Sequence, residues 1–270
     1  MNHFLITRFN IRVDDWTTTR DGYQVNQTDW LEHRFRLFMD YCWPSVLNQS
    51  DQNFTWLVFF DTTTPEQFKA LNENLVLKYP KFCPIYVDGI RSFLPSLRRE
   101  LMERTNTDYL ITSRIDNDDL IHRDFIKRVK EEAKPSGQLV IDMQRGYQLI
   151  NKSKIFEVRN YIHYFNPFIS LIESSSGARS VMDRNHRDWS TAEQVVAVTD
   201  KPYWIEHVHE RNKLNAARNQ LTLVRKTNWK EFGLDQPIRT YSLHKVLSTN
   251  LFIKLKRLIV KLKRLLGSKN

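Results

Sequence analysis

Residues 109–119 are Tyr-Leu-Ile-Thr-Ser-Arg-Ile-Asp-Asn-Asp-Asp, and this stretch decides how the chain is expected to fold. Its first seven residues are typical of a buried strand, and Asp116, Asn117, Asp118 and Asp119 follow directly. A strand that delivers acids into a loop predicts a site for a hard cation, because carboxylate oxygens suit Mg²⁺ or Mn²⁺ and substrate phosphates complete the shell. The alternative is an Asx-rich turn, since Asp and Asn are ordinary turn formers.

Apolar runs and helical spacings alternate on both sides of this stretch. Strands are expected, with amphipathic helices between the early ones, at residues 4–9, 56–60, 82–87, 109–115 and 139–143. This alternation predicts an α/β fold with a mostly parallel central sheet flanked by helices. Ligands of such sheets bind outside the carboxyl ends of the strands, where Asp61 and the acidic run both fall.

The pattern is less regular after residue 143. A hairpin is expected from residues 147–158, a Ser- and Arg-rich loop from 174–187, and a strand from 203–208. Ser190 and Glu193 have the spacing of a capping box and predict a helix through Val198.

Length and composition indicate one large globular unit. The chain has 270 residues, many aromatic residues and only 7 glycines, which excludes a collagen-like or disordered chain. Cys42 and Cys83 have no metal-ligand spacing, and Met1 leads directly into the first strand without a signal-peptide pattern. We therefore expect reduced cysteines and a cytoplasmic protein.

The net charge of +10 is concentrated at the C-terminal end. Residues 251–270 hold seven Lys or Arg and no acid, and without them the chain carries 34 basic against 31 acidic residues. Leucines fall on one helical face of this tail and basic residues on another: Leu251, Leu255, Leu258, Leu262, Leu265 and Leu266 against Lys254, Arg257, Lys261 and Arg264. A basic amphipathic helix too short and charged to span a bilayer suits an anionic membrane surface, and the alternative is packing on its own domain or on a partner. We expect a domain at 1–250 and a membrane-surface tail at 251–270.

Several segments resemble one family of bacterial glycosyltransferases, the putative rhamnosyltransferases. They are Phe4-Leu-Ile-Thr-Arg-Phe9, residues 53–61, residues 109–125 with the acidic run, and His207-Val-His-Glu-Arg-Asn212. The resemblance covers roughly residues 4–215 and implies the GT-A fold, in which a DxD motif holds a divalent metal beside a nucleotide sugar. It also implies that Asp116 and Asp118 are the DxD acids, with Asp116 facing the nucleotide and the metal shell, and that His209 completes the shell.

Other candidates follow from position. Thr7 and Arg8 could line the nucleotide pocket with Asp61, and Arg98 or Arg99 could reach the diphosphate with a bidentate fork, although a solvated helix face is the alternative for each arginine. Arg114 lies close enough to the acids for a structural ion pair, and His207 is a weaker metal candidate than His209.

The candidate general base is Asp188, which precedes the Ser190 cap and would take a proton from an acceptor hydroxyl. The competing interpretation is helix-dipole stabilisation, and Glu173 and Asp183 are further candidates.

These patterns predict a metal-dependent glycosyltransferase that moves a hexose or deoxyhexose, such as rhamnose, from a nucleotide sugar to a glycan or lipid-linked acceptor. The expected setting is the cytoplasmic face of the cell membrane, in envelope polysaccharide synthesis. A sugar nucleotidylyltransferase is the enzymatic alternative, but it usually needs a glycine-rich loop after the first strand, and residues 8–21 contain no glycine. A nucleic-acid-binding protein using the basic tail is the other alternative, and we expect no nucleic acid partner.

Overall fold

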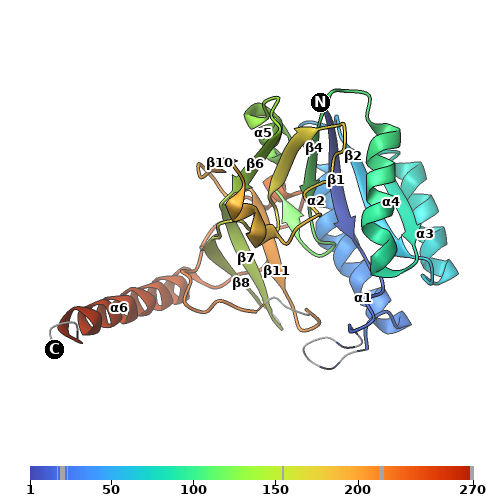
Figure 1. Cartoon of the computed structure of the whole chain (residues 1–270). Coiled ribbons are helices and arrows are strands. Elements are labelled where there is room, and N and C mark those ends of the chain that lie inside the picture. The colour runs from blue at the N-terminus through green and yellow to red at the C-terminus, as the bar shows by residue number, and fades with distance from the viewer. Residues whose placement is uncertain (17, 19–21, 23, 154, 213–215, 268–270) are drawn as a thin grey trace.

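The computed structural model of the chain describes residues 1–16, 18, 22, 24–153, 155–212 and 216–267. The predicted α/β architecture with a large central sheet and flanking helices is confirmed (Figure 1). The helices are α1 (Thr28–Leu37), α2 (Trp43–Leu47), α3 (Glu66–Lys78), α4 (Gly89–Arg104), α5 (Phe125–Glu132) and α6 (Leu243–Gly267). A π-helical turn, η1 (Phe38–Cys42), joins α1 to α2, and two 3₁₀ helices are η2 (His186–Thr191) and η3 (Trp229–Phe232).

The central sheet has the strand order β10-β6-β9-β4-β1-β2-β3. Its strands are β1 (Asn2–Arg8), β2 (Thr55–Asp61), β3 (Phe82–Val87), β4 (Tyr109–Arg114), β6 (Gln138–Met143), β9 (Ser170–Ser174) and β10 (Gln194–Val198). Neighbouring strands run parallel except β9, which lies antiparallel between β4 and β6. The carboxyl ends of β1, β2 and β4 therefore meet at one edge, which places their end residues together.

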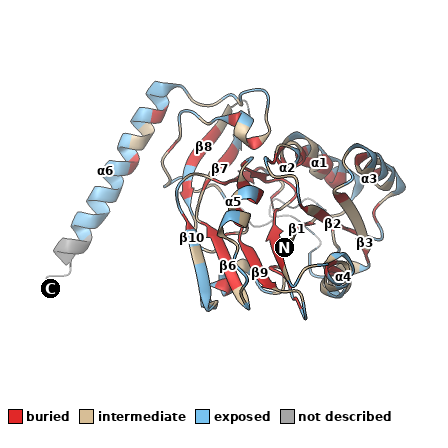
Figure 2. Cartoon of the chain, turned by 90° about the horizontal axis from the view of Figure 1, so that it is seen from above, coloured by how far each residue is buried: buried red, intermediate tan, exposed pale blue. Residues whose placement is uncertain are grey.

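Alternating side chains of β1 and β2 build a core on each face of this sheet. Leu5, Trp56, Val58 and Phe60 pack with the phenylalanines of α1, η1 and α3, whereas Phe4, Ile6, Leu57 and Phe59 pack with Phe93, Leu97 and Leu101 of α4. Side chains of successive strand residues point to opposite faces, so continuous apolar runs are needed when both faces are covered. Figure 2 shows α1, α2 and α3 on one side of β1–β3 and α4 on the other.

A second sheet, which the sequence did not predict as a separate layer, has the order β5-β11-β7-β8. Its strands are β5 (Leu120–Ile121), β7 (Arg145–Lys152), β8 (Ile155–Ile162) and β11 (Trp204–Val208). The predicted hairpin is confirmed as antiparallel β7–β8, and β5 directly follows the acidic run. Residues that follow β11 are thereby brought next to that run, because β11 pairs with β5.

The helix predicted from Ser190 to Val198 is wrong. The chain forms η2 up to Thr191 and then strand β10, which pairs in parallel with β6 at the edge of the large sheet. The side chain that caps η2 is Asn185, which accepts a hydrogen bond from the backbone N–H of Arg187. Pairing with β6 satisfies the backbone of the Val-Val-Ala-Val run and overrides the local capping pattern.

Helix α6 begins before the expected tail, at Leu243, and extends away from the rest of the molecule (Figures 1 and 2). It contacts the domain through one narrow face: Val246 and Ile253 are buried, Asn250 exchanges two hydrogen bonds with the backbone of Leu223, and Arg257 donates one to the carbonyl of Gln220. No helix in the described part of the chain is long and apolar enough to cross a membrane.

Candidate functional site

The acidic run lies at the carboxyl edge of the central sheet, directly after β4. Three hydrogen bonds fix its loop: Asp119 N–H to the carbonyl of Asp116 (3.2 Å), the Asn117 amide to the carbonyl of Phe9 (3.1 Å), and the backbone N–H of His207 to the Asp119 carboxylate (2.9 Å). The loop is therefore tied to the end of β1 on one side and to β11 on the other.

Asp118 is the centre of a cluster drawn from three distant segments. Arg34 of α1 donates to both carboxylate oxygens, from Nη1 at 2.8 Å to Oδ2 and from Nη2 at 3.3 Å to Oδ1, and Nη2 also donates to the side-chain oxygen of Asn117. His209 Nε2 lies 3.0 Å and the Asn212 amide 3.1 Å from the same Oδ2. Burial alone would raise the pKa of Asp118, but the charge of Arg34 and the hydrogen bond from His209 hold that pKa well below its usual range.

The predicted ligands of a divalent cation are Asp116, Asp118 and His209. Asp118 Oδ2 already accepts from Arg34, His209 and Asn212. The Nδ1 of His209 accepts the backbone N–H of Arg211 at 3.2 Å, so the ring proton lies on Nε2, the atom that would have to bind a metal. Among the described residues there is no group of three or more His, Cys, Asp or Glu that could hold a metal ion. As arranged, these side chains do not fit a cation.

Asp116 lies on the more open side of the loop and faces arginine. Its side chain is 38% exposed, and its Oδ1 is 3.3 Å from the guanidinium of buried Arg114, at the end of β4. Arg8 lies at the end of β1, and burial together with the charge of Arg114 lowers its pKa. The Nε of Arg114 has no hydrogen-bond partner in the described structure. Two arginines and one aspartate thus lie close together on this side of the loop.

The structure places two other predicted nucleotide contacts elsewhere. Thr7 is fully buried and accepts a hydrogen bond from the Trp56 indole at 3.0 Å. Asp61 is also fully buried, and its oxygens accept the backbone N–H groups of Arg12 and Thr63 at 2.9 and 3.0 Å. Both side chains therefore stabilise the ends of their strands and present no free polar atom to a ligand.

The remaining candidates form a loop-stabilising group beside α4. Arg98 makes an ion pair with Asp183, so two candidates neutralise each other. Glu173 is buried and its carboxylate accepts the backbone N–H groups of Arg179 and Ser180, at 3.1 and 2.7 Å. Burial raises the pKa of Glu173 in spite of these hydrogen bonds. These contacts hold the segment that leads from β9 to η2.

Asp188 is exposed and lies within η2, not before a longer helix. The charges of Arg114 and Asp116 both act on the pKa of His186, the first residue of η2, which is lowered mainly by burial. This short helix therefore lies beside the open side of the acidic loop. Asp188 lies in the first turn of η2, so the helix-dipole interpretation and the role as a base both stay predictions.

One further histidine and one arginine belong to the surroundings of the acidic loop. His207 is 1% exposed, with its ring packed against Tyr41 at a centroid distance of 4.5 Å, which supports a packing role. Arg34 was missed by sequence reasoning, because a lone arginine between the core positions Leu31 and Phe35 looks like any helix-surface charge. Only the meeting of α1 with the acidic loop reveals its role.

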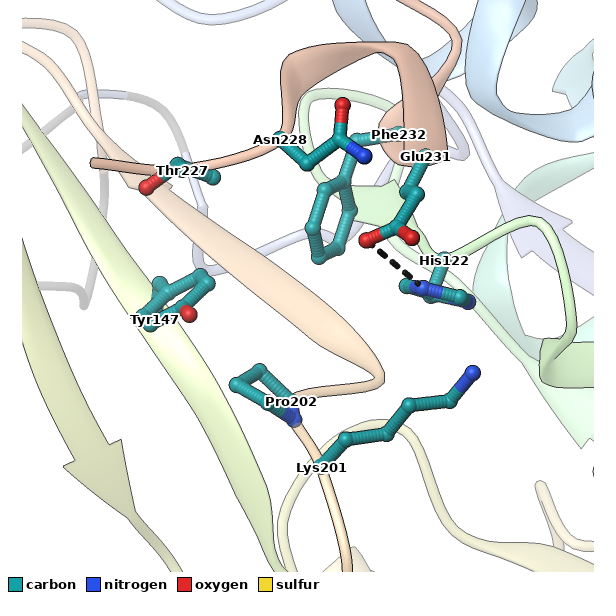
Figure 3. A pocket seen from close by; sticks show the side chains of 8 residues that line it. All are labelled: His122, Tyr147, Lys201, Pro202, Thr227, Asn228, Glu231 and Phe232. Atoms are coloured by element: carbon teal, nitrogen blue, oxygen red, sulfur yellow. Dashed lines mark ion pairs between the residues drawn. The ribbon is translucent and has the colours of Figure 1, made fainter.

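Two of the cavities among the described residues are lined partly by strand β7. A pocket of about 60 Å³ is shown in Figure 3, where His122 is 3.3 Å from Glu231 in an ion pair and Lys201 lies nearby. It is too small for a nucleotide sugar. A more open, polar cleft of about 600 Å³ is lined by residues 151–153 of the β7–β8 hairpin and by Glu210, which directly follows His209. The volume of this cleft is large enough for a sugar, and its lining reaches the residue after His209.

Comparison with solved structures finds matches at low identity. One is S. aureus TarS 1–349 in complex with UDP-GlcNAc (13% identity, TM-score 0.42, 82% of this chain and 63% of that one), and another is the mannosyltransferase PcManGT from Pyrobaculum calidifontis in complex with GDP-Man and Mn²⁺ (10%, 0.41, 78% and 58%). HddC from Yersinia pseudotuberculosis matches with 11% identity and a TM-score of 0.36, over 76% of this chain and 93% of that one. This chain spans about three fifths of the length of the TarS and PcManGT chains. No curated protein matches it.

A family model matches residues 5–221 of the chain, and its description is putative rhamnosyl transferase. The match includes β1, Arg34, the acidic loop with Asp118, and the His209 segment. It favours glycosyl transfer over nucleotidyl transfer or nucleic-acid binding. The chain therefore belongs to the putative rhamnosyl transferase family, a family of glycosyltransferases.

Proposed function

We propose that this protein transfers a hexosyl or deoxyhexosyl unit, such as rhamnose, from a nucleotide sugar to a hydroxyl of a glycan or lipid-linked acceptor in envelope polysaccharide synthesis. One observation carries the proposal beyond family membership. Arg8 and Arg114 converge with the acidic loop at the carboxyl edge of the sheet, where ligands of such sheets bind. An acceptor oxygen attacks the anomeric carbon while the nucleoside diphosphate leaves, and its developing negative charge needs fixed positive groups.

The chain's own residues supply such groups. Arg114 has an unpaired donor at Nε, and guanidinium forks match the geometry of phosphate oxygens. Asp116 is half-exposed between these arginines and the open side, where it can accept hydrogen bonds from a ribose or sugar hydroxyl. Asp188, in the neighbouring η2, is our candidate for the base that takes the acceptor proton. In this arrangement Arg34 and the ring proton of His209 occupy the position expected for a divalent cation.

The test is a donor-hydrolysis screen. The protein is incubated with a panel of nucleotide sugars, with Mn²⁺, Mg²⁺ or a chelator, and released nucleoside diphosphate is measured. We expect turnover of one donor class and a loss of at least about 100-fold in Asp118→Ala, because this substitution releases Arg34, His209 and Asn212 together. Asp108→Ala is the matched control, since Asp108 is exposed just before the same strand. Turnover of no donor, or equal turnover by Asp118→Ala, would contradict the proposal, and the chelator arm tests the predicted metal dependence.

We also propose that α6 lies on an anionic membrane surface, which would place the enzyme beside lipid-linked acceptors. Its exposed apolar stripe comprises Leu247, Leu251, Leu255, Leu258 and Leu262, at 48–59% exposure. At 3.6 residues per turn this stripe is turned roughly 130° from the face that contacts the domain. Lys254 and Lys261 flank one edge of it, exposed Phe252 and Ile259 extend the other edge toward Lys256 and Lys263, and the helix contains no acid. This arrangement supports an interface helix whose basic side chains reach lipid headgroups. The predicted contributions of Arg264, Leu265 and Leu266 lie outside the described side chains.

A further inference from the structure

In this structure the positive charge beside the Asp118 carboxylate is the guanidinium of Arg34. Arg34 donates to both oxygens of the carboxylate, and the two side chains are only 13% and 5% exposed. A two-pronged contact between arginine and a carboxylate is among the strongest charged hydrogen bonds in proteins. The guanidinium of Arg34 also packs over an aromatic ring of its own helix, since its central carbon lies 5.6 Å from the centroid of the Trp30 ring.

A divalent cation could not simply join this arrangement. Asp118 Oδ2 is already shared by donors from Arg34, His209 and Asn212, whereas a metal needs an oxygen lone pair directed at it. A metal ion bound to this carboxylate would also lie close to the positive guanidinium of Arg34, which would repel it. Binding of a metal to Asp118 therefore requires Arg34 to leave.

We propose that Arg34 competes with divalent cations for Asp118, so that the nucleotide-free protein excludes them from this residue. The competition is a property of the free protein, so the inference does not depend on the identity of the donor.

The experiment is a titration of the nucleotide-free protein with Mn²⁺, in which free Mn²⁺ is measured by electron paramagnetic resonance. Arg34→Met keeps an unbranched apolar stem against α1 and removes the guanidinium. We expect it to bind Mn²⁺ about 10-fold to 100-fold more tightly than the wild type, the range given by one strong charged contact. Arg34→Lys, whose single ammonium cannot hold both oxygens, should fall between them. Arg36→Met is the matched control, because Arg36 is exposed two positions along the same helix, and its affinity should equal that of the wild type.

The gain must also depend on Asp118. The double variant Arg34→Met with Asp118→Asn should lose the tight site, and circular dichroism with thermal melting confirms that each variant is folded. If Arg34→Met does not fold, the comparison of wild type, Arg34→Lys and Arg36→Met decides alone. Equal affinity of the wild type and the folded Arg34 variants overturns the inference, as does tight Mn²⁺ binding by the wild type that Asp118→Asn abolishes. Neither result involves a nucleotide sugar, so this inference can fail while the proposed function stands, and the reverse.

Discussion

The apolar stripe of α6 gives the sharpest prediction about where the enzyme works. We would replace Leu251, Leu255 and Leu258 together by glutamine, which is a good helix former and leaves the contacts of Val246 and Ile253 with the domain intact. The three leucines are 50–59% exposed, so their loss costs the folded domain little. A defect in this variant would therefore report on what the stripe contacts.

The magnitude follows from that exposure. Full burial of a leucine side chain is worth about 1.5–3 kcal/mol, so immersing the exposed half of each contributes about 1 kcal/mol. Three such residues give about 3 kcal/mol, or on the order of a 100-fold loss in membrane affinity. The flanking lysines add about 1 kcal/mol each near an anionic surface, and this part is screened by salt.

The assay is co-sedimentation with vesicles of phosphatidylglycerol and phosphatidylcholine in equal parts, against vesicles of phosphatidylcholine alone. Wild type should bind the anionic vesicles at low salt and bind more weakly in high salt, and the triple variant should stay in the supernatant. Leu77→Gln is the matched control, because Leu77 in α3 is 82% exposed and lies outside α6. Equal binding by the triple variant would refute the reasoning. A wild-type protein that forms a dimer in solution through this stripe and does not bind vesicles would also refute it.

Three further predictions concern the body of the protein. Gly146→Ala should lower the free energy of unfolding by about 1–3 kcal/mol in urea denaturation, because a Cβ at this position would lie 2.2 Å from the ring of Trp204. Gly137→Ala is the control and should leave that free energy unchanged, because a Cβ there would have nothing within 4 Å. Burial lowers the pKa of His3 to about 3, so below pH 6.5 only the unfolded chain takes up a proton at this residue, and the unfolding free energy of the wild type falls as the pH drops. His3→Gln should remove about 1.4 kcal/mol per pH unit from the slope of unfolding free energy against pH. Identical slopes for the two proteins would show that His3 is not the cause. Asp188→Asn should reduce sugar transfer by about 100-fold or more while nucleotide-sugar binding, measured by calorimetry, is unchanged, and full transfer activity would remove Asp188 as the base.

Local patterns were sufficient where a segment's structure depends on its own residues and on burial. The early strands, the amphipathic helices and the position of the acidic run after β4 follow from continuous apolar runs and from helical spacing, and they were predicted close to their observed bounds. The helix prediction for Gln194–Val198 was wrong because a capping pattern depends only on neighbouring residues, whereas the strand forms by pairing with the distant β6. Strand β9 was missed for the same reason, since nothing in Ser170–Ser174 tells that it inserts antiparallel between β4 and β6.

The sequence by itself determined the class of fold, the acidic loop at a strand end, the family and the basic amphipathic helix, because each is written in the order and spacing of residue types. Only the tertiary structure decided which charges meet. It joined Arg34 to Asp118 across a separation of 84 residues, buried Thr7 and Asp61 within their own hydrogen bonds, and turned the leucines of α6 away from the domain. The physical reason is that the energy of a charged or polar group depends on its neighbours in space, and those neighbours come from segments whose approach no local pattern encodes.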